Sequence, residues 1–456
     1  MSDSREKRAT FGSRLGIIFA TVGSAVGLGN IWRFPYMLGS NGGAAFLLVY
    51  LICTILLGLP VMIAEFYIGR HSKRNAVGAF RVLTPGTKWS LLGYIGVIAS
   101  FLILGFYFVI AGWTLEYIFQ SMTSSLGGKS VEVFETEFNN FSSDIFRPIM
   151  WAIIFIMMTH LIITTGVKNG IERSSKFLMP LLFVVLIILC VRSLTLPGAI
   201  AGLDFLFRPD FSKINSSVLL SAMGQAFFSL SIGMGCMITY ASYFGDKTNL
   251  QRTAFEVTLI DTLVAVLAGV MIFPAVFCFG IAPTAGPELV YITLPNVFGQ
   301  MPLSNLWACI FFILLAVAAL TSTISLHEVA TAYLHEEHKI TRKRAALLVT
   351  IGVCILACIS SLSFGIIKNA KLFGLTFFDL LDYVTAKIML PFGGMLICIF
   401  VGWRIDKKIL KAELTNKGSV PFYFFTIYCF LIRYIVPVAI GFILLNELGL
   451  LNFLKE

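Results

Sequence analysis

Two short clusters of glycine and oxygen-bearing residues interrupt long apolar stretches of the chain. The first runs from Gly23 to Asn30 and the second from Ser229 to Gly235, and each contains a Gly-x-Gly. A helix unwound at such a cluster frees backbone N–H and C=O groups, which are costly in lipid unless something binds them. A cation and a zwitterionic solute would satisfy these groups, because helix N-termini favour a carboxylate and free carbonyls favour a cation.

The alternative interpretation is that these glycines only allow close packing between helices. A single Gly-x-Gly would leave the two interpretations about equal, since short motifs often match by chance. Two clusters at corresponding positions, with the side-chain amide of Asn30 in the first, favour a binding function.

The composition places these clusters in a membrane protein. Of the 456 residues, 57% are hydrophobic and 13% are charged, against roughly 25% charged residues in soluble domains. A soluble fold has no means of hiding that much apolar surface behind so few charges. The composition therefore excludes a soluble enzyme, a disordered chain and a nucleic-acid-binding domain, despite the formal net charge of +10.

Long apolar runs predict the helices that position the clusters. A membrane-spanning helix needs about 20 mostly apolar residues. Scanning on that basis predicts eleven segments, at 13–39, 43–69, 90–123, 148–166, 175–197, 216–244, 254–282, 304–334, 345–364, 374–403 and 421–447. The glycine clusters fall in the first and sixth segments, so they open two successive five-helix units. Such a pair indicates an inverted-repeat transporter whose binding site lies near the middle of the membrane.

We therefore expect an all-α integral membrane protein made of one transporter domain over residues 1–447. Its first repeat would cover 13–197, its second 216–403 and its eleventh segment 421–447, followed by a short tail at 448–456. Most of the 34 Lys and Arg residues fall in the N-terminal segment and alternate loops after it. The positive-inside rule then predicts a cytoplasmic N-terminus and an external C-terminus in a bacterial inner membrane. The polar stretch Ser2–Arg8 and the long first apolar run predict no cleaved signal peptide.

Around the clusters the sequence resembles the neurotransmitter:sodium symporter family. The motifs that carry the resemblance are Gly23–Tyr36 with Asn41–Phe46, Gly58–Pro60 with Glu65, Gln225–Ser231 and Leu320–Ser322. The resemblance covers segments one to ten and implies the leucine-transporter-like fold, a 5+5 inverted repeat in which helices 1 and 6 are discontinuous. The eleven segments and a short outer loop without cysteines are typical of the bacterial branch, similar to its leucine and tyrosine transporters. They leave the oligomeric state open.

The resemblance implies two sodium sites and no organic cofactor. The first sodium would be held by Ala25, Asn30, Ser229, Asp261 and the carboxylate of the solute. The second would be held by Gly23, Val26, Ala318, Thr321 and Ser322. All of these groups offer oxygen atoms, which a hard cation requires. The alternative for the two hydroxyls is a bond to a carbonyl of their own helix, as is common in helices.

The resemblance also implies a pocket for a neutral amino acid. Tyr107 aligns with the tyrosine that donates to the carboxylate of the solute, and Gly27 stands where monoamine transporters carry an aspartate. The glycine leaves room for the carboxylate of an amino acid and argues against a monoamine. The implied pocket residues are Ser24, Ala25, Gly29, Ile103, Tyr107, Phe228, Ser229, Ser231, Met234, Ser322 and Leu326. They are mostly apolar, so we expect an apolar or aromatic side chain in the solute.

Charged residues inside the segments are rare, which makes each a candidate for function. Asp261 lies nearest the position of an Asn in chloride-dependent relatives, and Ala265 takes the place of their Ser. We hypothesise that the Asp261 carboxylate replaces chloride, and that it could also exchange a proton during transport. The alternative is a structural hydrogen bond. Glu65 is expected to accept backbone N–H groups freed where segment six breaks.

The resemblance implies two gates. Arg33 and Asp382 would close the outer side with Phe228 as a lid, and Arg8 and Glu336 would close the inner side. The alternative is ordinary anchoring at the membrane interface.

We therefore expect a sodium symporter that imports an amino acid by alternating access and is independent of chloride. A proton-coupled transporter of the same fold and a nutrient-gated sensor or channel are the alternatives. Gate residues on both faces favour alternating access over a continuous pore. An enzyme is the least favoured class, because the sequence carries no P-loop or nucleophile elbow. The expected partners are a neutral amino acid and the lipid bilayer, without nucleic acid.

Overall fold

The computed structural model describes residues 9–123, 126–279 and 290–450, which form a bundle of helices. The first half holds α1 (Arg14–Ala25), η1 (Gly29–Arg33), α2 (Phe34–Ser40), α3 (Ala44–Cys53), η2 (Thr54–Gly58), α4 (Leu59–Ser72), α5 (Ala76–Leu83), α6 (Ser90–Thr123), α7 (Val131–Ser143), α8 (Arg147–Thr164), η3 (Val167–Glu172), α9 (Arg173–Leu194), α10 (Ala199–Phe207) and η4 (Phe211–Lys213). The second half holds α11 (Ser216–Ser229), α12 (Cys236–Ala241), α13 (Leu250–Cys278), α14 (Thr293–Gly299), α15 (Ser304–Glu337), α16 (Arg342–Leu362), α17 (Phe377–Asp382), η6 (Tyr383–Met389), α18 (Leu390–Ile399), η7 (Phe400–Arg404), α19 (Lys407–Leu414), α20 (Phe425–Phe430), η8 (Leu431–Ile435) and α21 (Val436–Glu447).

The spans of the bundle agree with the predicted membrane segments. Within the described ranges, nine continuous spans are long and apolar enough to cross a membrane, and the bent pair Arg14–Ala25 with Gly29–Ser40 makes a tenth. The remaining predicted segment, 216–244, consists of the two short helices α11 and α12. The predicted end of segment seven, at 280–282, lies outside the described residues.

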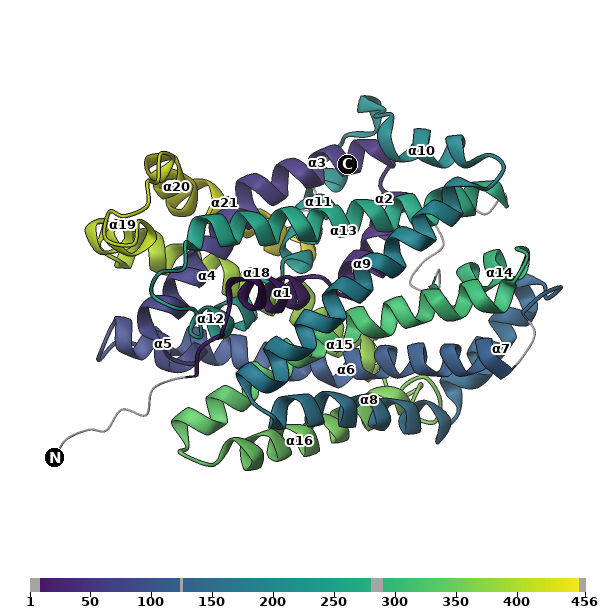
Figure 1. Cartoon of the computed structure of the whole chain (residues 1–456), viewed down its shortest axis with the longest axis horizontal. Helices are drawn as coiled ribbons and strands as arrows, with labels where there is room; N and C mark the ends of the chain where they lie inside the picture. The colour runs from purple at the N-terminus through teal and green to yellow at the C-terminus, as the bar shows by residue number, and fades with distance from the viewer. Residues whose placement is uncertain (1–8, 124–125, 280–289, 451–456) are drawn as a thin grey trace.

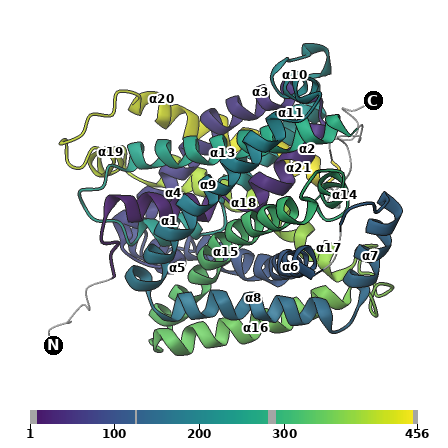
Figure 2. The same cartoon turned by 45° about the vertical axis from the view of Figure 1, so that its right-hand side comes forward.

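The two longest helices lie side by side in the core. The 34-residue helices α6 and α15 pack against each other along their length, and α1 packs against α15, α9 and α13. Figures 1 and 2 show α5 and α19 at one end of the bundle and α7 and α14 at the opposite end. The first glycine cluster, which begins in the last turn of α1, is buried among these helices.

The first glycine cluster breaks its helix after α1. Ser13 begins this helix by accepting a hydrogen bond from the Gly16 N–H, which satisfies one free donor of its first turn. Val26 then leaves the helical conformation with φ −68° and ψ 113°, and a helix resumes only at Gly29. The two halves of the span meet at an angle of 51°. The last carbonyls of α1 consequently have no helical N–H partner.

The second glycine cluster separates α11 from α12. Ser231, Gly233 and Gly235 have φ values of 52°, 84° and 77°, in the left-handed region that glycine adopts without strain. The Gly233 N–H donates to Oε1 of the buried Glu65 at 2.6 Å, which confirms the expected role of that carboxylate. An apolar residue at position 65 would leave this N–H unpaired in the core.

We expect Glu65→Ala to destabilise the protein because it strands the Gly233 N–H. An unpaired buried donor costs about 1–3 kcal/mol. Glu65→Gln is the matched control, since its amide oxygen can still accept the bond, and its loss should be smaller. Thermal unfolding of the purified variants measures both effects, and an equal loss in the two variants would contradict this role.

Candidate functional site

Three polar side chains from separate spans meet beside the break of α1. The Asn30 Nδ2 donates to Asp261 Oδ1 at 2.8 Å, to the Asp261 backbone carbonyl at 3.1 Å and to Ser229 Oγ at 3.0 Å. Ser229 Oγ donates in turn to Asp261 Oδ2 at 2.7 Å. All three residues are buried. With Ala25, whose position at the end of α1 leaves its carbonyl without a helical partner, they form an oxygen-rich cluster that suits a hard cation.

A second group of oxygen atoms surrounds the Val26 carbonyl. Thr321 Oγ1 lies 3.5 Å from this carbonyl oxygen, and Ser322 Oγ lies 3.3 Å from it. Thr321 also donates to the Ala318 carbonyl at 2.9 Å, so it contacts both α15 and the break. A Cβ on Gly23 would lie 3.2 Å from the Thr321 Cβ, which shows how closely α1 approaches α15.

The Tyr107 and Ser322 hydroxyls lie against the break of α1. The Leu28 N–H donates to the Tyr107 hydroxyl at 3.1 Å. A Cβ added to Gly27 would lie 2.3 Å from Ser322 Oγ and 3.0 Å from the Tyr107 hydroxyl. Any side chain at position 27 would therefore displace these two hydroxyls.

The two broken helices are joined directly. Ser231 Oγ donates to the Ser24 carbonyl at 2.8 Å. A Cβ on Gly29 would lie 3.0 Å from the Phe228 ring, so this ring packs against the break. The apolar residues implied for the pocket, Ile103, Met234 and Leu326, are all buried in the same core.

The residues implied for the gates are only partly brought together. The Arg33 guanidinium lies over the Phe228 ring, with its carbon 4.2 Å from the ring centroid. Within the described part of the chain, Arg33 and Asp382 form no ion pair inside 4.0 Å. Glu336 accepts from the backbone and side-chain nitrogens of Asn75 at 2.9 and 3.0 Å. Arg8 lies outside the described residues.

Sequence reasoning did not assign several buried polar contacts around this site. Gln225 Nε2 donates to the Gly29 carbonyl at 3.1 Å, and the Tyr50 hydroxyl donates to Ser229 Oγ at 3.3 Å. Glu328 accepts from the Tyr243 hydroxyl at 2.7 Å and from both terminal nitrogens of Arg342. The sequence does offer a signal for Glu328, because a glutamate within an apolar run is unusual. Nothing in the sequence around Tyr50 distinguishes it from a packing aromatic.

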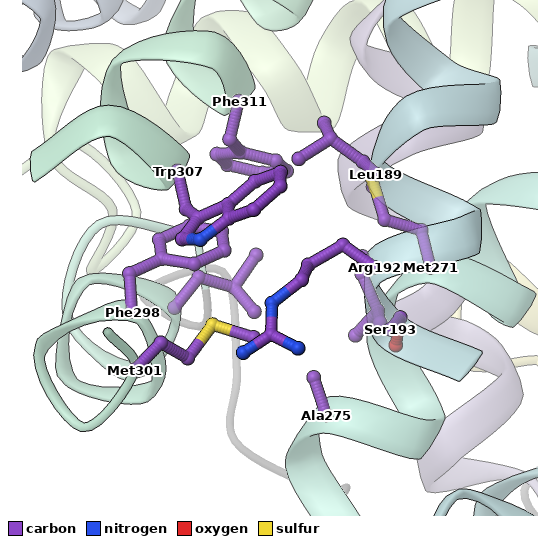
Figure 3. A pocket seen from close by; sticks show the side chains of 11 residues that line it. Leu189, Arg192, Ser193, Met271, Ala275, Phe298, Met301, Trp307 and Phe311 are labelled. Atoms are coloured by element: carbon purple, nitrogen blue, oxygen red, sulfur yellow. The ribbon is translucent and has the colours of Figure 1, made fainter. Parts of the chain in front are cut away.

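A small cavity lies outside this constellation, between α9, α13, α14 and α15 (Figure 3). The Arg192 side chain extends into it beneath the Trp307 ring, with 5.6 Å between the guanidinium carbon and the ring centroid. Its volume of about 20 Å³ is that of a water-sized space. This cavity is therefore too small for an amino acid, and it contains none of the residues implied for the pocket.

Known proteins with this sequence pattern are sodium-dependent transporters. A sequence profile of the sodium:neurotransmitter symporter family matches residues 8–140 and 128–453. An uncharacterised sodium-dependent transporter of Bacillus subtilis is 39% identical over 99% of this chain and 100% of its own length. A sodium- and chloride-dependent GABA transporter of Drosophila melanogaster is 27% identical over 91% of this chain and 49% of its own length.

A solved structure shares the fold along nearly the whole chain. The crystal structure of MhsT in complex with L-phenylalanine matches with a TM-score of 0.89 and 45% sequence identity, covering 96% of this chain and 100% of that one. This match shows a leucine-transporter-like bundle, and the relatives show dependence on sodium. The chain belongs to the sodium:neurotransmitter symporter family.

Proposed function

We propose that this symporter imports a neutral amino acid with an apolar or aromatic side chain, together with sodium. The observation that carries the proposal is the glycine at position 27, which leaves the Tyr107 and Ser322 hydroxyls facing the break of α1. A carboxylate could accept from such hydroxyls and from N–H groups at the start of a helix. The structural relative MhsT was crystallised with L-phenylalanine, which supports this class of solute.

Two sodium ions would be carried with the amino acid. The oxygens of Ala25, Asn30, Ser229 and Asp261 suit the first ion, and a carboxylate of the solute would complete its shell. The hydroxyls of Thr321 and Ser322 beside the Val26 carbonyl suit the second. Binding of both ions at the breaks would stabilise the conformation that holds the amino acid.

The Asp261 carboxylate would make chloride unnecessary. It lies in the first oxygen cluster, and its only side-chain partners among the residues that the structure describes are the neutral Asn30 and Ser229. A buried carboxylate without a cationic partner supplies the negative charge that would balance a bound sodium. The same feature supports the alternative, in which Asp261 takes up a proton and the transporter is driven by protons.

Transport would proceed by alternating access. Arg33, Phe228 and Asp382 would close the outer side, and Arg8 with Glu336 the inner side. The loops rich in Lys and Arg predict a cytoplasmic N-terminus. The α5 and α19 end of the bundle (Figure 1) would then be the inner face.

Uptake of a radiolabelled amino acid into proteoliposomes tests the proposal. We expect accumulation only with an inward sodium gradient, unchanged when gluconate replaces chloride. Competition by each common amino acid would identify the solute, and large apolar or aromatic ones should compete best. Uptake that needs no sodium but follows a proton gradient would instead support the proton-coupled alternative.

We expect Tyr107→Phe to raise the KM for the amino acid and to lower thermal stability, because it also removes the acceptor of the buried Leu28 N–H. A hydrogen bond to a charged group contributes about 1.5–3 kcal/mol, which corresponds to a change of roughly 10- to 150-fold. Tyr291→Phe is the matched control, because its buried hydroxyl donates at 3.0 Å to the Ile110 carbonyl of α6 rather than to either break. A similar KM in both variants would contradict a role for Tyr107 in binding the carboxylate.

A further inference from the structure

Arg433 belongs to the span Phe425–Glu447, and its guanidinium is held on an aromatic platform. Its guanidinium carbon lies 4.1 Å from the Trp403 ring centroid and 5.6 Å from that of Tyr434. Trp403 Nε1 donates to the Arg433 carbonyl at 3.1 Å, and the Trp403 and Tyr434 rings meet edge to face. A Cβ on Gly402 would lie 3.0 Å from the Arg433 Cα, so η7 and η8 are in close contact here. The platform fixes the position of the guanidinium without using its N–H groups.

No described residue accepts a hydrogen bond from the Arg433 guanidinium. Its Nε is buried and has no partner in that part of the chain. Among the residues that the structure describes, Arg433 forms no ion pair within 4.0 Å, and neither do Arg404, Lys407, Lys408 and Lys411 on the adjoining η7 and α19. The Arg433 guanidinium is therefore held in one orientation beside other cations that have no described acidic partner. Such a group is suited to bind an anion with several oxygen acceptors.

An apolar groove begins at the same guanidinium. A cavity of about 380 Å³ is lined by Ile399, Trp403, Arg433, Tyr434, Pro437 and Val438. A second cavity of about 560 Å³ runs between α11 and α21, and it shares Tyr434 and Val438 with the first. Apart from Ser216 and Asn446, its lining is apolar or aromatic. The two cavities together thus offer one cationic end and a long apolar wall.

The cationic end lies at a membrane surface. Trp403 precedes Arg404, the last residue of its membrane span, and α19 and α20 lie together at that end of the bundle (Figure 1). Exposed aromatic residues, including Trp403 and Tyr434, surround the site, as is usual at the level of lipid headgroups. The apolar wall along α21 runs from this level towards the membrane interior.

We propose that Arg433 and this groove bind an anionic glycerophospholipid of the surrounding bilayer. The phosphate oxygens would accept from the Arg433 guanidinium, with the neighbouring lysines adding attraction, and an acyl chain would lie along α11 and α21. Because α11 carries Ser229 at its far end, such a lipid would contact one of the two broken helices. The lipid would be recognised by its charge at one end and by its chain at the other.

Lipid titration by native mass spectrometry of the detergent-purified protein tests this proposal. We expect the wild-type protein to bind dioleoylphosphatidylglycerol more tightly than dioleoylphosphatidylcholine. Arg433→Gln should weaken phosphatidylglycerol binding by at least about fivefold, the effect of one interfacial basic residue. Lys343→Gln is the matched control, because it removes an exposed positive charge at the start of α16. It should leave the affinity within twofold of the wild type.

A second variant keeps the test decisive if Arg433→Gln fails to fold. Val438 is 58% exposed and lines both cavities, so Val438→Trp should fill the groove and weaken phosphatidylglycerol binding at least as much. Excess glycerol 3-phosphate should not displace the lipid, since it lacks the chain. Any one of four results would overturn the proposal. These are equal affinity for the two lipids, equal losses of affinity in Arg433→Gln and Lys343→Gln, unchanged affinity in Val438→Trp, and displacement of the lipid by glycerol 3-phosphate.

Discussion

Asp261→Ser is expected to make uptake dependent on chloride. The wild-type carboxylate accepts from Asn30 and Ser229 in the first oxygen cluster, and its removal leaves a bound sodium without a balancing charge. The lost charge-assisted hydrogen bonds contribute about 1.5–3 kcal/mol each, so uptake without chloride should fall at least roughly tenfold. The smaller serine leaves space for an anion, and chloride should restore much of the activity. Uptake into proteoliposomes in chloride and gluconate media measures both effects.

A carboxylate elsewhere provides the control for this substitution. Asp204 is exposed on α10, so Asp204→Ser should leave uptake unchanged in either medium. If Asp261→Ser transports as well as the wild type without chloride, the carboxylate does not balance the sodium charge. Lost uptake that chloride fails to restore would instead assign Asp261 a role in proton exchange or in structure.

Gly27→Ala is expected to reduce uptake by roughly 100-fold or more, because the new methyl group competes with the groups that bind the solute. Its Cβ would lie 2.3 Å from Ser322 Oγ and 3.0 Å from the Tyr107 hydroxyl, so both must move. Displacement of two hydrogen-bonding groups, at about 1–1.5 kcal/mol or more each, accounts for an effect of this size. Initial rates of uptake at saturating sodium measure it.

The chain offers a matched glycine for comparison. A Cβ on Gly224, in the middle of α11, would meet no atom within 4 Å. Gly224→Ala should therefore fold and transport normally, with a small gain in stability because alanine favours a helix. If Gly27→Ala kept wild-type uptake, the hydroxyls of Tyr107 and Ser322 would not be essential for the solute.

The sequence predicts the breaks of the two helices because glycine and serine residues in a long apolar run leave a local signal. The fold class and the family followed from this signal, and the comparisons confirm both. The clustering of Asn30, Ser229 and Asp261 could be predicted only through the resemblance. These residues are separated by 199 and 32 positions in the chain, and no local pattern relates them.

Other contacts depend on packing that no sequence pattern reveals. Glu328 has no basic neighbour at helical spacing within its own helix, and its partner Arg342 begins the next one. The 51° bend between α1 and its continuation likewise depends on how neighbouring helices fill the space. Sequence reasoning found the charged residues inside the membrane, but the identity of their partners required the arrangement of the helices.

The bond from Ser231 Oγ to the Ser24 carbonyl gives the two repeats a thermodynamic linkage. It joins the last turn of α1, just before the break, to the unwound turn between α11 and α12, so a ligand that shifts either segment would change the energy of both. If an ion bound at one break raises the affinity for the solute by some factor, the solute must raise the affinity for the ion by the same factor. We therefore expect the two interrupted helices to respond together to whatever binds at either of them.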